Sequence, residues 1–553
     1  MDCIFCKIAK KIIQAKIITE TKKRRSFVPV LVSENLSRKE VAKVAIQTPY
    51  LPGIRIDIGQ TRYYPFRDLA VHLTGYVATI SQSEKTGDPV LELPGFKIGK
   101  SGIEKSFDSK MRGRGAQRQV EVNALGRIIR KLPGEEIQIG HDVELTIDVS
   151  LQSFSTKRLA QGNSVYIPVD DPRIQRALSE GRNLPPGTDP VNGYVNFDYK
   201  GNVQAPESGA AVVMDAFNGD VLALASTPGF DPNSFSSGLN AADWENLLSN
   251  PRSPMTNKAV SGQYSPGSTF KMIVCLAALE AGVAHQETKV NCSGMIEFGD
   301  SRFHCWKKDG HGWLNMIDAI EQSCDVYLYE LAKRVGIKRI GEMAARFGFG
   351  EAFNFGLPGE NRGLIPTPAW KRKTFGQAWH AGETLITSIG QGFILCTPLQ
   401  LAVMTSRLVN GGRLVLPRLV KNERAEIQKR KSLQLSPQHL HTVLKGMDKV
   451  VNGSQGTARR VVDQNMKFQF GGKSGSVQVK RISLDERESG KLKNKDRPWH
   501  ERDHAMFVAF APLKSPRYVV SVVVEHGGGG STMAAPIARD ILAEALRLNP
   551  SKL

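Results

Sequence analysis

The sequence lacks long hydrophobic runs and has few cysteines. In a chain of 553 residues, no apolar run approaches the length of roughly 18 residues that marks a membrane-spanning helix. The opening stretch, MDCIFCKIAKKIIQAKIITETKKRR, is too often interrupted by lysine to form the core of a signal peptide. Seven cysteines in a chain of this length exclude a scaffold stabilised by disulfides. We therefore expect no transmembrane or signal segment in this chain.

Internal repeats, zinc-finger spacings and arginine-rich arms are also absent, although the chain is strongly basic. The formal net charge is +20 and the pI is about 9.6. Such a charge suits nucleic acid, an anionic membrane surface or an acidic polymer. Because the basic residues are spread along the chain, we do not expect nucleic acid to be a partner. The hydrophobic fraction of 41% is typical of a folded protein, and the length predicts two or three domains.

The order of strand and helix patterns predicts an α+β fold. Residues 1–23 read as unstructured or borrowed sequence, although their C-x-x-C resembles the start of histidine-triad hydrolases. Residues 24–143 mix β-rich runs, such as the alternating IRIDIGQTRYYPF, with turns rich in glycine and charge, and predict an extended, irregular α+β module. Residues 144–553 form a second domain, in which the polar, turn-rich stretch at about 162–208 predicts a surface insertion.

The patterns in the second domain predict an antiparallel sheet covered by helices. VELTIDVSLQSFSTKRLA reads as a strand that runs into a helix, and GAAVVMDAFNGDVLALAS reads as a hairpin. The hairpin turns at Asn218-Gly219, a preferred two-residue turn. Helical patterns dominate residues 268–450. Three strand patterns, KFQFGGKSGSVQV, HAMFVAFAP and YVVSVVVEH, then lead to the amphipathic helix MAAPIARDILAEALRL.

The stretch QYSPGSTFKM places a hydroxyl and an amine at the start of an apolar helix. Ser268 and Lys271 are three residues apart and so share one helical face, where the free N–H groups of the helix start also point. A serine is a poor nucleophile until a base takes its proton, and a lysine can be that base only as a neutral amine. A helix-capping serine followed by an ordinary lysine is the alternative, because this spacing is common.

Two further motifs favour chemistry at this helix. EQSCDVYLYELA places Ser323 two residues before Asp325, at the head of another helical pattern. FGGKSGSVQV places a lysine, two serines and a glycine on a late strand, at Lys473, Ser474, Gly475 and Ser476. Lys473 would supply the second cation that lowers the pKa of Lys271, the glycine would let a substrate backbone approach, and the serines would hold a carboxylate. Motifs of this form and order occur in penicillin-binding proteins and serine β-lactamases.

The sequence closely resembles the class B penicillin-binding proteins of the elongation type (penicillin-binding protein 2). RSFVPVLVSENL, LPGIRIDIGQTRYYPF, HLTGYV and MRGRGAQRQVEVNALGR resemble the N-terminal pedestal, or dimerisation-type domain, of that family. PGSTFK, SIGQGFILCTPLQLA, DHAMFVAFAP and EHGGGGSTMAAPIARDIL resemble its transpeptidase domain, which has the fold of penicillin-binding proteins and serine β-lactamases. The resemblance covers nearly everything after about residue 24.

Three departures from the family pattern stand out. The cytoplasmic tail, the transmembrane helix and the following R-G-x-I-x-D-R-N-G segment are missing, so we expect an N-terminally truncated chain or a split gene. The second motif reads Ser-Cys-Asp in place of Ser-x-Asn, and aspartate is familiar there in the elongation branch. The third motif reads Lys-Ser-Gly-Ser in place of Lys-Thr-Gly-Thr. Serine keeps the hydroxyl, so we expect function to survive.

The resemblance implies a peptidoglycan D,D-transpeptidase that acts during cell elongation and binds penicillin covalently. Ser268 would attack the bond between the terminal D-alanines of a stem peptide, and Lys271 would take its proton. Ser323 would pass a proton to the departing D-alanine, and the backbone N–H groups of Ser268 and Ser476 would hold the oxyanion. Lys473, Ser474 and Ser476 would bind the substrate carboxylate.

The resemblance also implies partners and a location. Peptidoglycan stem peptides and β-lactam antibiotics would occupy the site, and a polymerising glycosyltransferase and a scaffold protein of the elongation complex would bind the pedestal. The enzyme would work at the periplasmic face of the bacterial inner membrane. A D,D-carboxypeptidase, a β-lactam-hydrolysing enzyme or a β-lactam sensor of the same fold is the alternative.

Three cysteines and one histidine fall within a short stretch beside the second motif. Cys292, Cys305, His311 and Cys324 match the ligand types of a structural tetrahedral zinc site, although their spacing is looser than in zinc fingers. They could instead be small buried residues, or two of them could form a disulfide. Some elongation-type relatives hold zinc at this place with carboxylate, histidine and cysteine ligands, so the resemblance favours one structural zinc ion. Cys275 and Cys396 lie in apolar runs and are predicted to be core residues.

Overall fold

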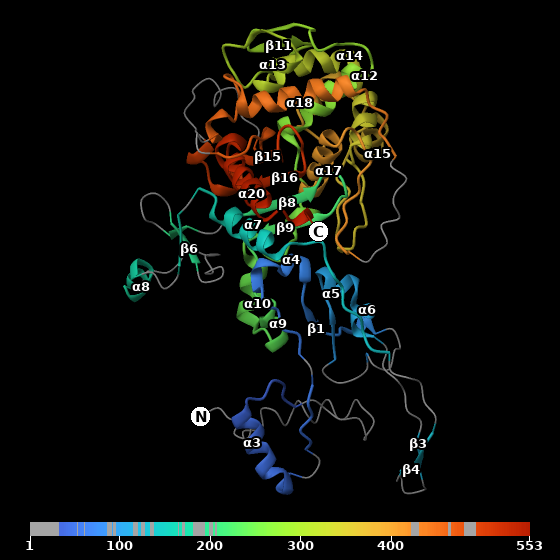
Figure 1. Ribbon diagram of the computed structural model, residues 1–553, viewed down its shortest axis with the longest axis vertical. Coiled ribbons are helices and arrows are strands. Elements are labelled where there is room, and N and C mark those ends of the chain that lie inside the picture. Colours follow the sequence, from blue (N-terminus) through green and yellow to red (C-terminus); the bar gives the residue numbers. More distant parts are fainter. Residues whose placement is uncertain are drawn as a thin grey trace. The chain divides into compact units, whose positions relative to one another are not determined.

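The computed structural model divides into two compact units (Figure 1). One unit contains residues up to Arg67 together with 74–142 and 231–244, and the other contains 68–73, 143–230 and 245–553. The structure describes residues 32–51, 54–59, 61–85, 91, 96–113, 120–122, 128–132, 138–163, 165–168, 172–180, 194–197, 203–204, 207–421, 431–462, 466–480 and 494–552. The predicted segment 1–23 and much of the predicted insertion lie outside these residues.

The N-terminal unit contains short elements, as expected for an irregular α+β module. Its helix α3 begins after Ser37, whose side chain accepts from the Glu40 backbone N–H while the Glu40 carboxylate accepts from Ser37 N, a reciprocal cap. The α-helices and strands that lie wholly within this unit are α3 (Arg38–Gln47), β1 (Val77–Thr79), β2 (Lys97–Gly99), α5 (Gly102–Ser106), α6 (Asp108–Arg112), β3 (Val120–Val122), β4 (Ile128–Lys131) and α9 (Asn233–Ser237). Strands β1 and β2 pair with each other, as do β3 and β4, and both pairs are antiparallel.

One strand prediction for this unit is wrong. The alternating run around IRIDIGQTRYYPF forms no strand in residues 54–59 or 61–66. An alternating pattern becomes a half-buried strand only when a sheet covers its apolar side, but Ile54, Ile56 and Ile58 are all exposed. The alternation is real, and no partner strand covers it within the described residues.

The second unit is built on a five-stranded antiparallel sheet in the order β14-β15-β16-β8-β9. The two hairpin strands, β8 and β9, come first in the chain and pair with each other. The three late strands join the same sheet through β16, which pairs with β8. The strands are β8 (Gly209–Asp215), β9 (Val221–Thr227), β14 (Gly471–Val477), β15 (His504–Ala511) and β16 (Tyr518–Val524). The predicted hairpin and late strands are confirmed, but the predicted two-residue turn is wrong. β8 ends at Asp215 and β9 begins at Val221, so residues 216–220 form a longer loop, in which Gly219 has a positive φ of +82° and Asn218 does not.

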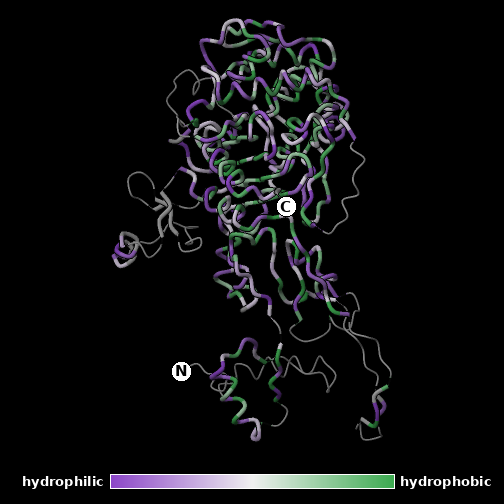
Figure 2. The backbone as a smooth tube through the Cα atoms, in the orientation of Figure 1, coloured by the Kyte–Doolittle hydropathy of each residue, from purple (hydrophilic) through white to green (hydrophobic). Residues whose placement is uncertain are grey.

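Helices cover both faces of this sheet. Helices α7 (Val149–Gln161) and α20 (Ala535–Leu548) pack on one face, and α17 (Pro398–Val409) packs on the other (Figure 1). The short helix α11 (Lys258–Ser261) packs beside α17. Figure 2 shows hydrophobic residues along these strands and helices. The sheet strands β8, β9 and β16 are buried along their whole length, as expected when helices lie on both sides. The predicted antiparallel sheet covered by helices is therefore confirmed.

A helical block carries the middle of the chain. Its longest helix, α14, contains a break at Gly336, where φ is +77°. The block comprises α12 (Lys271–Glu280), α13 (Met316–Glu321), α14 (Asp325–Arg346), α15 (Pro368–Phe375), α16 (Ala381–Ser388) and α18 (Pro437–Asn452). Two small strand pairs interrupt it, β10 (Val290–Cys292) with β13 (Gly312–Leu314), and β11 (Met295–Phe298) with β12 (Ser301–His304).

The start of the second unit and the insertion differ in detail from the predictions. VELTI makes only an isolated bridge, between Leu145 and Val420, before α7 begins. The described parts of the insertion contain α8 (Pro172–Ser179) and a small antiparallel sheet of β5 (Val165–Pro168), β6 (Tyr194–Phe197) and β7 (Val203–Gln204). None of the helices in the described residues combines the length and the hydrophobicity that a membrane span requires.

A glycine lets α18 lie close against α13, the helix that leads into the second motif. A Cβ atom added at Gly446 would lie 2.7 Å from Ile320 Cβ, close to the backbone of α13. We predict that Gly446→Ala lowers the free energy of unfolding by about 1–3 kcal/mol, because overpacking outweighs the gain in helix propensity. Thermal unfolding provides the measurement. Gly341→Ala is the control, because its Cβ would meet only the end of Ile365; equal stability of both variants would contradict the packing argument.

Candidate active site

The predicted nucleophile lies on a tight turn, directly before an α-helix. Ser268 belongs to the 3₁₀ turn Gly267–Phe270, and α12 begins at Lys271, whose backbone N–H donates to the Ser268 carbonyl. Gly267 has φ +55°, and its N–H donates to Gly390 O at 2.8 Å. A Cβ at Gly390 would lie 2.1 Å from Gly267 O, so the SIGQG motif places a glycine where the turn leaves no room for a side chain.

The predicted base is fully buried and is held by the second motif. Lys271 Nζ donates to Asp325 Oδ1 at 2.8 Å, to Ser323 O at 2.7 Å and to Ser323 Oγ at 3.1 Å. A buried ammonium is tolerated only when it is paired and fully hydrogen-bonded, and these three acceptors satisfy its three donors. The first two predicted motifs are therefore brought together by direct hydrogen bonds.

The third motif approaches the same serine from the opposite side. Lys473 Nζ donates to Ser323 Oγ at 3.0 Å, so one hydroxyl lies between two lysine side chains. Ser323 itself has φ +54°, a left-handed conformation that is costly for a residue with a Cβ. Burial, and next the charge of Lys271, lower the pKa of Lys473 well below its usual range. In the structure it is thus Lys473 that is disposed to lose a proton.

The third-motif strand presents its residues alternately to the inside and to the substrate side. Lys473 and Gly475 are buried on one face of β14, whereas Ser474 and Ser476 are partly exposed on the other. Strand β15 holds the register of this edge strand, pairing Ser474 with Phe507 and Ser476 with Ala505. The two hydroxyls therefore point to the accessible side, where a substrate carboxylate can reach them.

The structure gives the glycine of the third motif a packing role. A Cβ at Gly475 would lie 3.2 Å from Pro266 O and 3.3 Å from Thr269 Cγ2, on the buried face of β14. The glycine thus lets the nucleophile turn pack closely against the strand, and its predicted role toward a substrate backbone stays a prediction.

Four contacts at the site were not predicted from the sequence. Thr457 Oγ1 lies 3.1 Å from Ser474 Oγ, and Gly530 N donates to Ser476 Oγ at 3.2 Å. Gln391 Nε2 donates to Ser476 O at 3.3 Å, and Trp306 N donates to Asp325 Oδ2 at 2.9 Å. Gln391 and Gly530 fall in motifs that carry the family resemblance, which is the signal that could have identified them. Nothing in the sequence around Thr457 indicates its contact.

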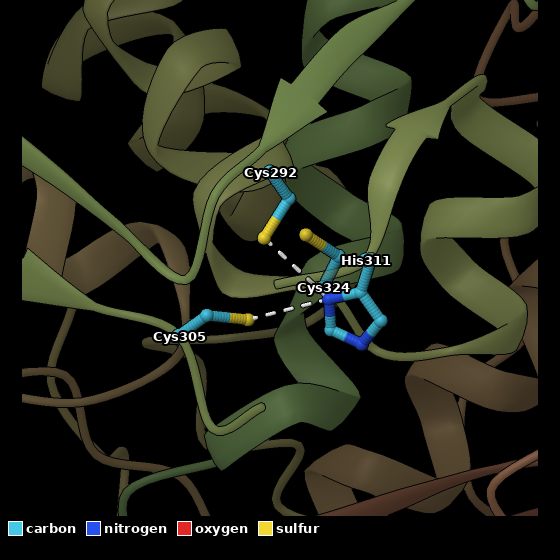
Figure 3. Close-up of side chains that lie close together, drawn as sticks. All are labelled: Cys292, Cys305, His311 and Cys324. Carbon is cyan, nitrogen blue, oxygen red and sulfur yellow. Dashed lines mark hydrogen bonds between the residues drawn. The ribbon is translucent and has the colours of Figure 1, made fainter. Parts of the chain in front are cut away.

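The four predicted metal ligands converge (Figure 3). Their ligand atoms all lie within 4.8 Å of one another, and all three cysteines are free. His311 Nδ1 is 3.5 Å from Cys292 Sγ and 3.6 Å from Cys305 Sγ. Cys324, between Ser323 and Asp325, completes the group and also caps α14. The predicted disulfide alternative is not present among these residues, and the other two cysteines, Cys275 and Cys396, are buried in the core as predicted.

The three cysteine thiols of this cluster differ in pKa. The Cys324 thiol, by hydrogen bonding, lowers the pKa of Cys292 to about 6 and lowers the pKa of Cys305 far below its usual range. The same contacts raise the pKa of Cys324 itself. All three thiols can ionise together at this spacing only when a cation lies among them.

The cluster is joined to the catalytic lysine through backbone groups. Cys305 Sγ accepts from Asp325 N at 3.4 Å. Trp306, which follows Cys305 in the chain, donates its backbone N–H to the Asp325 carboxylate. The Trp306 indole N–H donates to Ser323 O at 3.1 Å, the oxygen that Lys271 also binds. Movement of the cluster would therefore displace both partners of the lysine.

A serine at a helix start, two buried lysines around a second serine and hydroxyls on an edge strand define a serine acyltransferase site. Residues 209–543 match the model of the penicillin binding protein transpeptidase domain, and residues 4–145 match the penicillin-binding protein dimerisation domain. The chain belongs to the penicillin-binding protein transpeptidase family, and the family predicted from the sequence is confirmed.

Curated relatives match almost the whole chain. The peptidoglycan D,D-transpeptidase MrdA of Acinetobacter baumannii is 33% identical over 522 residues, which cover 92% of this chain and 70% of that protein. MrdA of Escherichia coli is 30% identical over 539 residues, 95% of this chain and 77% of that protein. The stage V sporulation protein D of Bacillus subtilis is 26% identical over 559 residues, an alignment that covers 96% of this chain and 71% of that protein.

Solved structures agree with this fold. PBP2 of Helicobacter pylori in complex with MreC has a TM-score of 0.76 and 28% identity, covering 98% of this chain and 92% of that chain. PBP2 of Pseudomonas aeruginosa in complex with WCK 5153 has a TM-score of 0.68 and 31% identity, with 89% and 93% coverage.

The two oxygens of the Asp325 carboxylate accept from Lys271 Nζ and from Trp306 N. Replacing this carboxylate with an amide should therefore disturb the site. In Asp325→Asn a single oxygen must replace both acceptors, so either Lys271 or Trp306 N–H loses its partner. A hydrogen bond involving a charged group contributes about 1.5–3 kcal/mol, so we predict a loss of roughly 10- to 100-fold in the rate constant for acylation by penicillin. Stopped-flow fluorescence with a labelled penicillin measures it.

The matched control is Asp318→Asn, on the preceding helix, where the carboxylate binds the partly exposed Lys449 at 2.9 Å. An exposed ion pair contributes little, so acylation should stay within about twofold of the unmodified protein. Equal rates for both variants would contradict the assigned role of Asp325.

Proposed function

We propose that the protein is a peptidoglycan D,D-transpeptidase that cross-links stem peptides through an acyl-enzyme on Ser268. The observation that carries this is the buried Lys271 ammonium, held between Ser323 and Asp325 at the head of the helix that follows the serine turn. Relatives that share the fold and the family are named as peptidoglycan D,D-transpeptidases. No other described part of the chain combines a serine with buried lysines in this way.

Acylation begins at the turn before α12. Ser268 Oγ attacks the carbonyl between the two terminal D-alanines of a stem peptide, and Lys271 takes the hydroxyl proton in the state in which its side chain is a neutral amine. The backbone N–H groups of Ser268 and Ser476 hold the oxyanion that forms. Ser323 lies between the two lysines, so it can pass a proton to the amine of the departing D-alanine.

The substrate carboxylate binds at the third-motif strand. Ser474 and Ser476 present hydroxyls there, and Lys473 contributes positive charge from behind the strand when it is protonated. When both lysines are protonated they outnumber the single carboxylate of Asp325, and the site then attracts an anion. The amine of a second stem peptide then attacks the acyl group on Ser268, which forms the cross-link and frees the serine. A β-lactam enters by the same acylation step and remains as a stable acyl-enzyme.

We further propose that Cys292, Cys305, His311 and Cys324 hold one structural zinc ion. Zinc bonds of about 2.3 Å to sulfur and about 2.0 Å to nitrogen place tetrahedral ligands roughly 3.5–3.8 Å apart. The distances from His311 Nδ1 to the sulfurs of Cys292 and Cys305, 3.5 and 3.6 Å, fit that geometry. Four protein ligands leave no open position, so the ion would cross-link β10, the loop after β12 and the second motif, and would take no part in the chemistry.

Partners and location follow from the family. One relative is described as PBP2 in complex with MreC, and another similar structure is described as a peptidoglycan synthase complex that coordinates polymerization and crosslinking. We propose that the N-terminal unit binds such a scaffold protein and a polymerising glycosyltransferase at the periplasmic face of the inner membrane. Its described residues expose large apolar side chains, among them Ile46, Tyr50, Ile58 and Tyr63, which is typical of a partner surface.

The nucleophile assignment predicts a single covalent adduct. After penicillin treatment, intact-mass spectrometry should show one adduct on the peptide that contains Ser268, and Ser268→Ala should show none. Ser265→Ala, in the same segment, is the control and should keep the adduct. With stem-peptide substrate the active protein should yield cross-linked dimers, whereas trimmed monomers alone would indicate a carboxypeptidase. An adduct of equal yield in Ser268→Ala would refute the assignment.

The zinc proposal predicts that the protein contains zinc and that replacing one ligand removes most of it. Purified protein should contain about one zinc per chain, and Cys305→Ser should lose most of it, unfold at a lower temperature and acylate more slowly. Elemental analysis and thermal unfolding are the measurements. Cys396→Ala, which removes a buried cysteine outside the cluster, should keep the zinc. Less than about a tenth of an equivalent, with a melting temperature unaffected by a strong chelator, would exclude the ion.

A further inference from the structure

A partly buried carboxylate links the nucleophile segment to the loop beside the third motif. Glu525 directly follows β16, and its Oε1 accepts from the Tyr264 hydroxyl at 2.8 Å while its Oε2 accepts from Ser208 Oγ at 2.5 Å. Tyr264 lies four residues before Ser268 and is only 6% exposed. None of these three side chains belongs to the catalytic motifs, and the mechanism above does not use them.

Tyr264 is fixed by its backbone as well as by its hydroxyl. Its N–H and carbonyl form a two-bond bridge with Cys396, at 2.9 and 2.8 Å, and its ring packs edge-on against His504. The hydroxyl bond to Glu525 is the contact that joins this segment to the far end of β16. A shift of that contact would move the turn of Ser268, because only three residues separate them.

On its other side Glu525 begins the glycine-rich loop that reaches the third-motif strand. His526 has φ +56°, and its N–H donates to His504 Nδ1 at 2.9 Å. Gly528 N donates to Asp503 O at 2.8 Å, and Gly530 N donates to Ser476 Oγ. A Cβ at Gly530 would lie 2.2 Å from Gly475 O, so this loop lies directly on the third-motif strand.

We propose that Tyr264 and Glu525 are a positioning pair that sets the separation of Ser268 and Ser476. Those two residues supply the two oxyanion N–H groups, so the inference rests on the proposed acyl-transfer function. Neither member of the pair touches the substrate. Because a small displacement of reacting groups has large kinetic effects, loss of the pair should slow the acylation step and leave the initial binding of the substrate unchanged.

The buried surroundings of the carboxylate supply compensating positive charge. Lys258 is 2% exposed and its Nζ donates to Ser253 O at 3.1 Å. Burial lowers the pKa of Lys258 to about 8 and lowers the pKa of Arg252, and the charge of Glu525 opposes both shifts. The pair is therefore held in place by both hydrogen bonds and charge, as expected of a fixed structural link.

The test compares Tyr264→Phe with a change at Tyr518, a buried tyrosine at the other end of β16 from Glu525. Tyr518 is 1% exposed and donates to Asn549 Oδ1 at 2.7 Å, so Tyr518→Phe removes an equivalent hydroxyl far from the site. Stopped-flow acylation with a fluorescent penicillin separates the binding constant from the acylation rate constant. Tyr264→Phe should lower the rate constant roughly tenfold with unchanged binding, whereas Tyr518→Phe should leave both within about twofold.

A double-mutant cycle with Glu525→Ala extends the test and provides a second variant. Glu525→Ala should match Tyr264→Phe, the double variant should be no slower than either, and Glu525→Gln, which keeps an acceptor, should restore most of the rate. Additive losses, a normal acylation rate in Tyr264→Phe, or an equal loss in Tyr518→Phe would overturn the proposal. A parent protein that penicillin does not acylate would instead refute the proposed function itself.

Discussion

Two lysine side chains are buried against a single serine hydroxyl, with one carboxylate to balance them, and the rest of the catalytic unit depends on this arrangement. Lys271 and Lys473 are both fully buried, and both donate to Ser323 Oγ. Burying an ammonium is costly unless each of its protons finds an acceptor, and two close ammonium groups also repel. The group is stable only where Asp325 and backbone carbonyls are held at hydrogen-bonding distance, and the fold supplies that rigidity.

Each member of the arrangement comes from a different element, and each element is fixed by contacts outside the site. The sheet register between β14 and β15 sets the position of Lys473. The 3₁₀ turn before α12 packs closely on β14 at Gly475, and that contact helps to set the position of Lys271 relative to Lys473. The site is therefore sensitive to glycines at close contacts between its elements, and Gly390, Gly475 and Gly530 lie at such contacts.

Local patterns predicted the elements and the reacting residues, whereas the contacts between elements could not be predicted. Asn218-Gly219 indicated a hairpin, although the loop is longer than the two-residue turn predicted and only Gly219 has a positive φ. The three-residue spacing of Ser268 and Lys271 placed both on one helix face. Thr457 could not be identified, because its contact with the third motif depends on how the loop after α18 folds. The run around Ile58 was mistaken for a strand, because alternation reveals a potential apolar face and does not reveal what covers it.

Ser323 shows how the surroundings stabilise a conformation that its own backbone disfavours. A left-handed non-glycine residue costs about 1–3 kcal/mol, so it persists only when the chain is fixed on both sides. On the N-terminal side, the buried Glu321 accepts from Gln455 N at 3.0 Å and so ties the end of α13 to the loop after α18. On the C-terminal side, Cys324 caps α14 and belongs to the cysteine–histidine cluster. Releasing either side would let Ser323 relax to an extended conformation and would carry its hydroxyl away from both lysines. The cluster thus acts on the chemistry through the backbone of Ser323 and through the contacts that Cys305 and Trp306 make with Asp325.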